Sequence, residues 1–309
     1  MTAVTLIENF RAVFYAPFYA PIALGAYEAE GLDVVLKTSG DASRTASSLI
    51  AGEGDVSWGG PLRLMMALEK NPQAAAMAFC EAVGRDPFFL LGREPNLHFR
   101  PEHLRGKKLG VVSEVPTPWM CLRHDLRLAG IDPAQIGTIS GRSMAENVAA
   151  LRSGEADVIQ VFHPYAGTLL KEGTAHVWYA AATRGLVSYT TLNTTRDFAD
   201  RNPDVLRGMC RAMYRSQKWI AAHGAGELAA LLSAYFPEIP SPILTACFES
   251  YKKVGLWNRD PMLQREGFEW LRDAALADGL LKKKFAYEAC VDMQHAEAVV
   301  KENPPPLQG

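Results

Sequence analysis

The sequence contains little cysteine, and its cysteines show no pairing pattern. The 309 residues include five cysteines, an odd number, at widely spaced positions: Cys80, Cys121, Cys210, Cys247 and Cys290. Such spacing argues against a disulfide framework and against the paired-cysteine motifs that bind zinc or carry redox chemistry. We therefore expect buried free thiols, which behave as small apolar side chains.

The sequence also lacks a large excess of charge of either sign. The chain has 32 basic and 34 acidic residues, which give a formal net charge of -2. Nucleic-acid-binding proteins usually carry a basic patch or stripe. We therefore expect no nucleic-acid partner.

Long apolar runs are missing as well. No run approaches the roughly 20 residues that cross a bilayer. The first twenty residues do not form a secretory signal, because they lack a basic start and because Glu8 and Arg11 interrupt the apolar stretch. The sequence therefore fits either a cytoplasmic protein or an exported protein whose leader has been removed.

Signatures of catalysis are missing too. The sequence has no GxSxG, HExxH or Walker loop, and its histidines show no metal-ligand spacing. We therefore expect no metal, no cofactor and no catalytic residue, although an active site can also draw its residues from distant positions.

What the sequence does contain is a short segment that occurs twice, which we call the repeated device. The stretches "SSLIAGEGDVSWGGP" (47–61) and "AALRSGEADVIQVFHP" (149–164) each predict a helix end, a tight turn and a short strand. Duplication explains the likeness better than chance does, because five residue pairs match at one constant offset: Leu49 and Leu151, Gly52 and Gly154, Glu53 and Glu155, Asp55 and Asp157, Val56 and Val158.

Each copy closes a larger unit. Residues 3–60 and 107–162 both predict strand–helix–strand–helix–strand, which favours two parallel sheets covered by helices. The apolar run 86–94 and the β-branched run 186–195 are predicted to cross between two lobes. We therefore expect lobe one to comprise residues 1–90 plus 190–309, and lobe two residues 91–189.

Sequence motifs in these units resemble those of one protein family. The stretches "GLDVVLKTSGDASRTASSLIAGEGDVSWGG", "HLRGKKLGVV", "ALRSGEADV" and "DFADRNPDVLRGMCRAMYRS" resemble, in order and spacing, SsuA/THI5-like (NMT1/THI5-like) substrate-binding proteins of ABC transporters. The resemblance extends from residue 4 to about residue 290. It implies the α/β, two-lobed fold of type II periplasmic binding proteins. In that fold, each lobe is a mostly parallel sheet flanked by helices, and two hinge strands cross between the lobes.

The resemblance also implies a cellular role. It predicts a periplasmic protein with a small-molecule ligand and, as partners, an ABC permease and ATPase. We expect a monomer.

Ligands of open parallel sheets bind beyond the carboxyl ends of the strands, where helix N-termini offer free N–H groups. Lobe one offers the strand-end loops "ENFRAVFY", "SGDAS" and "GGP", and lobe two offers "SEVPTP", "SGRS" and "FHP". The candidate ligand-binding residues are Asn9, Phe10, Arg11, Tyr15, Ser39, Gly40, Trp58, Gly59, Gly60, Pro116, Thr117, Arg142, Phe162 and His163.

These residue types predict a small planar ligand with acceptor or anionic groups. Trp58 and Phe162, one from each copy of the device, are expected to hold a flat ring between them. Arg11 and Arg142 are expected to pair with a carboxylate or sulfonate. The alternative interpretations are that these aromatic side chains belong to the core and that these arginines are solvated on the surface. Asn9 matches an asparagine of thiamine-pyrimidine receptors in this group, but its surroundings, "IENFRAVFY", depart from their pattern.

Three functions fit these observations. The first is a receptor of an ABC importer for a thiamine-type pyrimidine, a sulfonate or an aromatic carboxylate, and it is favoured because a ligand clamp needs no nucleophile. The second is a cytoplasmic enzyme on the same fold, similar to a pyrimidine synthase or to a dihydroxyphthalate-type decarboxylase. The cysteine-rich motif of the yeast pyrimidine synthase has no match in this sequence. The third is a cytoplasmic sensor or ligand-storage module.

Overall fold

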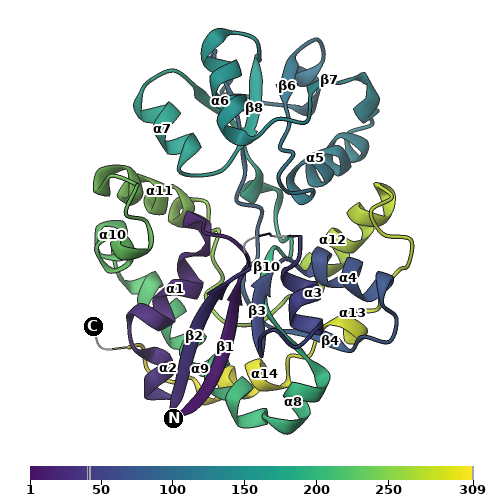
Figure 1. Cartoon of the computed structure of the whole chain (residues 1–309). Coiled ribbons are helices and arrows are strands. Elements are labelled where there is room, and N and C mark those ends of the chain that lie inside the picture. Colours follow the sequence, from purple (N-terminus) through teal and green to yellow (C-terminus); the bar gives the residue numbers. More distant parts are fainter. Residues whose placement is uncertain (40, 42, 308–309) are drawn as a thin grey trace.

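The computed structural model describes residues 1–39, 41 and 43–307 as two α/β lobes, one above the other in Figure 1. The first sheet has the strand order β2-β1-β3-β10-β4, and the second has the order β7-β6-β8-β5-β9. In each sheet one strand, β10 or β5, runs antiparallel to both its neighbours, while the other pairs are parallel. The predicted fold class, with a mostly parallel sheet in each lobe, is therefore confirmed.

The strand bounds show how the chain crosses between the sheets. The first sheet comprises β1 (Thr2–Glu8), β2 (Leu32–Thr38), β3 (Val56–Gly59), β4 (Ala76–Val83) and β10 (Thr190–Thr195). The second comprises β5 (Phe89–Gly92), β6 (Lys108–Gly110), β7 (Gly137–Ile139), β8 (Val158–Val161) and β9 (His176–Ala180). Two connections, residues 84–88 and 181–189, therefore join the sheets. The exact lobe boundaries remain a prediction.

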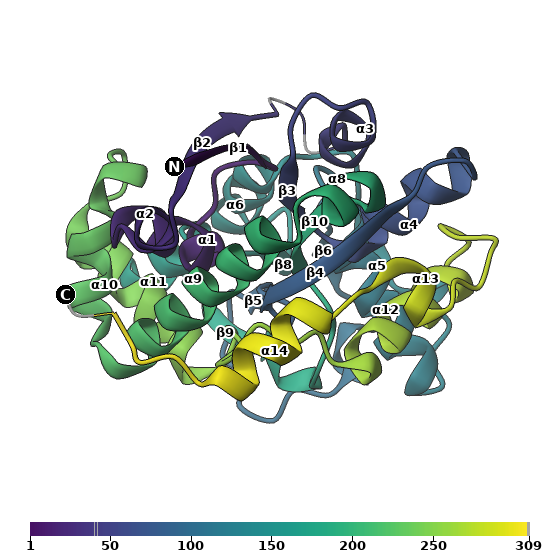
Figure 2. The ribbon, with the colours of Figure 1, turned by 90° about the horizontal axis from the view of Figure 1, so that it is seen from below.

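Helices cover both sheets. We call the first sheet and its helices the first lobe, with η1 (Val13–Tyr15), α1 (Ala16–Ala23), α2 (Ala26–Ala29), α3 (Thr45–Ile50), α4 (Pro61–Lys70), α8 (Arg196–Arg201), α9 (Pro203–Ala222), α10 (Ala225–Leu232), η5 (Ser233–Tyr235), α11 (Ser241–Lys253), α12 (Arg265–Ala277), α13 (Tyr287–Cys290) and α14 (Gln294–Glu302). The second lobe has η2 (Pro101–Leu104), α5 (Thr117–Leu128), η3 (Pro133–Gln135), α6 (Met144–Ser153) and α7 (Tyr165–Lys171), and η4 (Ala181–Arg184) opens the return connection. Seen from below, the long helix α9 lies beside α14 (Figure 2).

The repeated device has the same structure in both lobes. The Asp55 carboxylate accepts a hydrogen bond from the backbone N–H of Thr5 at 2.8 Å, and the Asp157 carboxylate accepts one from Lys108 at 2.8 Å. Each aspartate thus ties the start of β3 or β8 to the first strand of its own repeated unit, β1 or β6. This shared contact is the physical reason why both copies carry an aspartate.

The glycines of the device also correspond. Gly52 and Gly154 have φ angles of 79° and 82°. These angles lie in the left-handed region, where a residue with a Cβ is strained and glycine is not. Both helices therefore end in the way that the shared glycine predicts.

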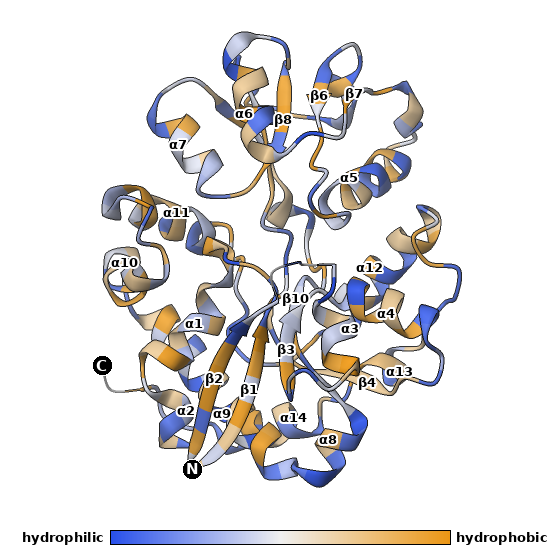
Figure 3. Ribbon diagram, viewed as in Figure 1, coloured by the Kyte–Doolittle hydropathy of each residue, from blue (hydrophilic) through white to orange (hydrophobic). Residues whose placement is uncertain are grey.

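One apolar core extends through both lobes. Its buried residues include Leu6 and Trp58 of the first lobe and Ile159 and Phe162 of the second. In Figure 3 the apolar residues concentrate in strands such as β8, while α8 and many loops are polar. The five cysteines are free and buried, as expected. Within the described part of the chain, no helix has the length and apolarity to cross a membrane.

Candidate ligand-binding cleft

Two cavities lie between the lobes. The inner one has a volume of about 30 Å³ and is lined by Asn9, Phe10, Phe14, Tyr15, Gly60, Arg63, Phe88, Val115, Thr117 and Tyr189. The outer one has a volume of about 390 Å³ and opens to solvent. Together they form what we call the cleft.

The inner cavity is built by strand ends. The loop after β1 supplies Asn9 and Phe10, the turn after β3 supplies Gly60, and the start of α5 supplies Thr117. The structure thus brings together five of the predicted residues, namely these four and Tyr15. They meet because the carboxyl ends of β1 and β3 face the carboxyl end of β6 across the cleft, as the strand-end rule predicts.

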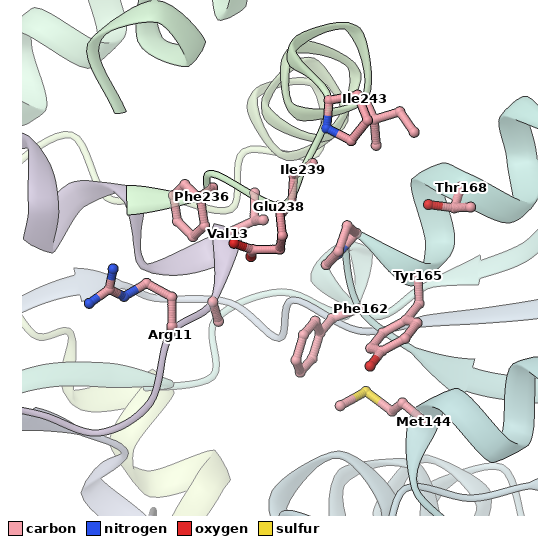
Figure 4. A pocket seen from close by; sticks show the side chains of 13 residues that line it. Arg11, Val13, Met144, Phe162, Tyr165, Thr168, Phe236, Glu238, Ile239 and Ile243 are labelled. Atoms are coloured by element: carbon pink, nitrogen blue, oxygen red, sulfur yellow. The ribbon is translucent and has the colours of Figure 1, made fainter. Parts of the chain in front are cut away.

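The outer cavity is mostly apolar. Figure 4 shows Arg11, Phe236, Glu238 and the isoleucines of one lobe facing Met144, Phe162, Tyr165 and Thr168 of the other. Phe162 and Tyr165 flank the turn between β8 and α7, where the repeated device ends in Phe-His-Pro rather than Gly-Gly-Pro. The two copies of the device therefore present different chemistry to the cleft.

An aromatic pair separates the two cavities. Phe10 lines the inner cavity, Phe162 lines the outer one, and their rings stack at 6.4 Å with an interplanar angle of 22°. Phe162 also meets Phe14 and Phe88 edge to face at 5.4 and 5.1 Å. Because Phe10 belongs to the first lobe and Phe162 to the second, the pair also forms a contact between the lobes.

Trp58 does not reach the cleft. Its side chain is fully buried, stacks on Phe18 at 5.2 Å and meets Tyr19 edge to face at 5.3 Å. β3 is a central strand with both faces covered, so a large side chain on it can belong entirely to the core. The prediction that Trp58 and Phe162 hold a ring between them therefore disagrees with the structure, where Phe10 is the partner of Phe162.

Arg11 lines the outer cavity, but its charge is already engaged. Its guanidinium donates to both carboxylate oxygens of the fully buried Glu8, at 2.8 and 3.0 Å, and to the carbonyl oxygen of Tyr235 at 3.1 Å. Tyr19 and Thr38 donate to the same carboxylate at 2.7 and 3.1 Å. Hydrogen bonding to Glu8 raises the pKa of Arg11. Arg11 is thus first of all the counter-ion of a buried acid.

Arg142 and His163 also differ from expectation. Arg142 pairs with exposed Glu155 at 2.7 Å and lines neither cavity. His163 is 1% exposed, neither ring nitrogen has a hydrogen-bond partner in the part of the chain that the structure describes, and burial lowers its pKa to about 3. Its ring packs against Phe89 and Tyr251 at 4.9 and 4.7 Å. It is therefore a neutral core residue between the lobes.

The remaining predicted residues support the cleft from behind. The Ser39 hydroxyl donates to the carbonyl oxygen of Asn9 at 3.0 Å, and Asn9 in turn donates to the Tyr15 hydroxyl at 3.0 Å. The carbonyl oxygen of Gly59 accepts bonds from the side chains of β10, and Pro116 precedes α5. Gly40 lies outside the described residues.

Sequence reasoning missed Arg63 and Tyr189. Arg63 lies in the first turn of α4, two residues after Pro61, and Tyr189 lies just before β10. Within the described ranges, the guanidinium of Arg63 has neither an ion pair nor a hydrogen bond, and burial lowers its pKa. The sequence "GGPLR" (59–63) could have indicated Arg63, because the first turn of a helix that follows a strand end also faces the ligand.

Two α/β lobes with matching strand orders, joined by two connections around a cleft, define the class of type II periplasmic binding proteins. The chain belongs to the NMT1/THI5 like family, whose pattern matches residues 14–226. This family assignment confirms the resemblance that the sequence motifs indicated.

Individual proteins agree with this assignment. YtlA of Bacillus subtilis (strain 168), to which a binding function is ascribed, is 27% identical over 304 residues, which cover 98% of this chain and 91% of YtlA. A solved structure ascribed to the periplasmic sulfonate-binding protein SsuA of Methylobacillus flagellatus KT has a TM-score of 0.76 at 15% identity, with 100% and 98% of the chains covered. The desulfurization enzyme DSZB, in complex with biphenyl-2-sulfinic acid, has a TM-score of 0.69 at 13% identity, with 97% and 99% covered. At such identities the structural likenesses show the fold alone.

Proposed function

We propose that the protein is the solute receptor of an ABC importer and that it binds a small planar ligand in the cleft between its lobes. The family supports this role, and YtlA and SsuA carry matching ascriptions. The proposal includes a permease and an ATPase as partners and a location outside the cytoplasmic membrane, where such receptors meet their solutes.

The observation that carries the proposal is that both cavities are lined from both lobes. A cavity of about 30 Å³ is close to the space that one water needs, whereas small-molecule sites measure roughly 300–1,000 Å³. The inner cavity can therefore hold part of a ligand only if the lobes separate further. The outer cavity, at about 390 Å³, already has room for a ring. A clamp that opens to admit its ligand and closes around it fits both volumes.

An enzyme on this fold is the second candidate, because DSZB shares it. The cysteines argue against thiol chemistry in the cleft: all five are buried, and none lines either cavity. Burial raises the pKa of Cys247 to about 12 and that of Cys290 to about 11, so both remain protonated and unreactive at neutral pH. The described residues that line the cavities therefore favour binding over thiol catalysis.

A thermal-shift screen of sulfonates, aromatic carboxylates and aminopyrimidines tests the proposal, because a ligand that binds only the folded state raises its apparent stability. Calorimetry on the best compound should then show that Phe162→Ala weakens binding by about 1–3 kcal/mol, the scale of a lost aromatic contact. Phe99→Ala is the control, since Phe99 packs on Trp178 and Tyr179, away from the cleft. Equal losses in both variants, or chemical turnover of the compound, would contradict the proposal.

A further inference from the structure

The strongest unused feature of the cleft is an arginine that is not neutralised. Arg11, Arg142 and Arg184 all pair with carboxylates. Arg63 lines the inner cavity, yet no carboxylate within the described ranges lies within 4.0 Å of it. A half-buried guanidinium has lost part of its hydration, and an anion in the cavity would compensate for that loss. Arg63 therefore points to a ligand with a negative charge.

Tyr189 is a second, independent indication. It is 8% exposed and lines the same cavity, but its hydroxyl has no hydrogen-bond partner among the described residues. Burial raises its pKa well above the usual value, so the hydroxyl keeps its proton and can donate. The hydroxyl keeps access to solvent and can donate to an acceptor that a ligand brings into the cavity.

Two helix starts from opposite lobes add to this. α4 has 10 residues and α5 has 12, and neither is capped by a side chain. Gly60, just before α4, and Thr117, the first residue of α5, both line the inner cavity. Pro61 and Pro118 have no N–H, and the N–H of Arg63 donates to the carbonyl oxygen of Gly60 at 3.0 Å. The two helix starts therefore favour an anion mainly through the positive ends of their dipoles.

Negative charge is scarce around this space. None of the described residues that line the inner cavity is an aspartate or glutamate. Glu8 is nearby in sequence, but Arg11 compensates it. Asp41, the acidic group that acts on Arg63 through space, is exposed and accepts a hydrogen bond from the backbone of Ser43. Asp86, which acts on Tyr189 through space, is paired with Arg184 at 2.9 Å. Among the described residues that line the inner cavity, Arg63 is therefore the one charged side chain.

We propose that the inner cavity is an oxyanion subsite, in which Arg63, the Tyr189 hydroxyl and the starts of α4 and α5 bind the carboxylate, sulfonate or sulfinate head of the ligand. This inference rests on the proposed receptor function and narrows its ligand class. The planar part of the ligand then extends past Phe10 and Phe162 towards the outer cavity. Arg63 thereby takes the role that the sequence suggested for Arg11 and Arg142.

The test uses the full chain, constant ionic strength and three probes: inorganic sulfate, benzenesulfonate and the neutral benzamide. Wild-type protein should show saturable stabilisation by sulfate and should bind benzenesulfonate at least tenfold more tightly than benzamide. Arg63→Met should abolish the sulfate effect and remove that preference. Arg63→Lys should keep part of it, because it restores the charge without the bidentate fork. Tyr189→Phe should weaken anion binding about three- to tenfold, while Arg142→Met is the matched control and should change nothing.

The outcomes separate the subsite from the receptor function. If sulfate and benzenesulfonate act equally on wild type and Arg63→Met, the anion subsite is overturned. If benzamide binding is nevertheless lost in Phe162→Ala, the receptor function stands without the subsite. If Arg63→Met weakens benzamide and benzenesulfonate equally, Arg63 is structural and the assignment is wrong.

Discussion

At the scale of single residues, Arg11 illustrates how a charge can serve the fold before it serves a ligand. Glu8 is fully buried at the end of β1, and Arg11 supplies two of the hydrogen bonds that its carboxylate accepts. Removing one partner of a buried pair leaves an uncompensated charge, which costs far more than the pair itself contributes.

We therefore expect Arg11→Ala to lower the free energy of unfolding by about 2–4 kcal/mol whether or not a ligand is present. Arg142→Ala should change it much less, because the pair of Arg142 with Glu155 is exposed to solvent. Urea unfolding of the two variants measures both values. Similar small losses would show that Glu8 does not depend on Arg11.

His163 predicts a pH dependence of stability. Burial lowers its pKa to about 3 in the folded protein, against about 6.5 when unfolded. Between these values the unfolded state binds more protons, so the free energy of unfolding should fall as the pH drops from about 6.5 towards 3, by up to about 1.4 kcal/mol per unit. His163→Leu should remove this contribution. Urea unfolding at pH 7, 6 and 5 compares the slopes, and equal slopes would contradict the burial of a neutral imidazole.

The residue scale is also where the sequence was least informative. The strand-end rule places Trp58 at the cleft. A strand end alone does not show whether an aromatic side chain points into the cleft or, as on the fully buried strand β3, into the core. Nor can sequence show that two arginines already have carboxylate partners. The three-dimensional pairings of Glu8 with Arg11 and of Glu155 with Arg142 decide which guanidinium is available.

At the scale of elements, sequence patterns were more reliable. "LDVVLKT" predicted a strand that the structure places at the same residues, Leu32–Thr38. The capping-box spacing of Ser143 and Glu146 predicted the start of α6, where both hydrogen bonds are present. The strand β4 was missed, because "AMAFCEAV" is buried on both faces and lacks the alternation that distinguishes a strand from a helix. The stretch "APIALGAYEAE" (20–30) is typical of one helix that ends at Gly31, but the structure has two helices, α1 and α2, separated at Gly25, whose φ is 63°.

The repeated device gives a prediction at this scale. Asp55→Ala and Asp157→Ala should each lower the free energy of unfolding by about 1–3 kcal/mol, because each leaves a strand N–H without its acceptor. Glu53→Ala is the control, since its side chain has no hydrogen bond among the described residues and only its backbone carbonyl accepts one, from Lys37. Denaturant unfolding compares the three variants. A neutral effect at either aspartate would show that the two copies do not share this role.

At the scale of the whole molecule, an ion pair spans the lobes away from the connections. Asp278, at the end of α12, pairs with Arg123 and, at 3.2 Å, with Arg127 on α5. Its side chain is 1% exposed. Figure 1 shows α5 lying above α12. We expect this contact to break if the lobes separate, so it should stabilise the conformation in which the lobes are together.

Asp278→Asn should therefore weaken ligand binding about two- to tenfold, because more of the binding energy must then be used to close the lobes. Glu302→Gln is the control, since Glu302 pairs with Arg207 and Arg211 inside the first lobe. Calorimetry with one fixed ligand compares the variants. Unchanged affinity in Asp278→Asn would show that the pair does not contribute to closure.

The central claim is that the two lobes close on a ligand held between them, and small-angle X-ray scattering tests it most directly. The protein is measured alone and with a calorimetrically saturating concentration of the tightest ligand from the screen. The account predicts a smaller radius of gyration in the complex and, for ligand-free Asp278→Asn, a larger one than for ligand-free wild type. Identical scattering with and without a saturating ligand would contradict closure of the lobes on that ligand.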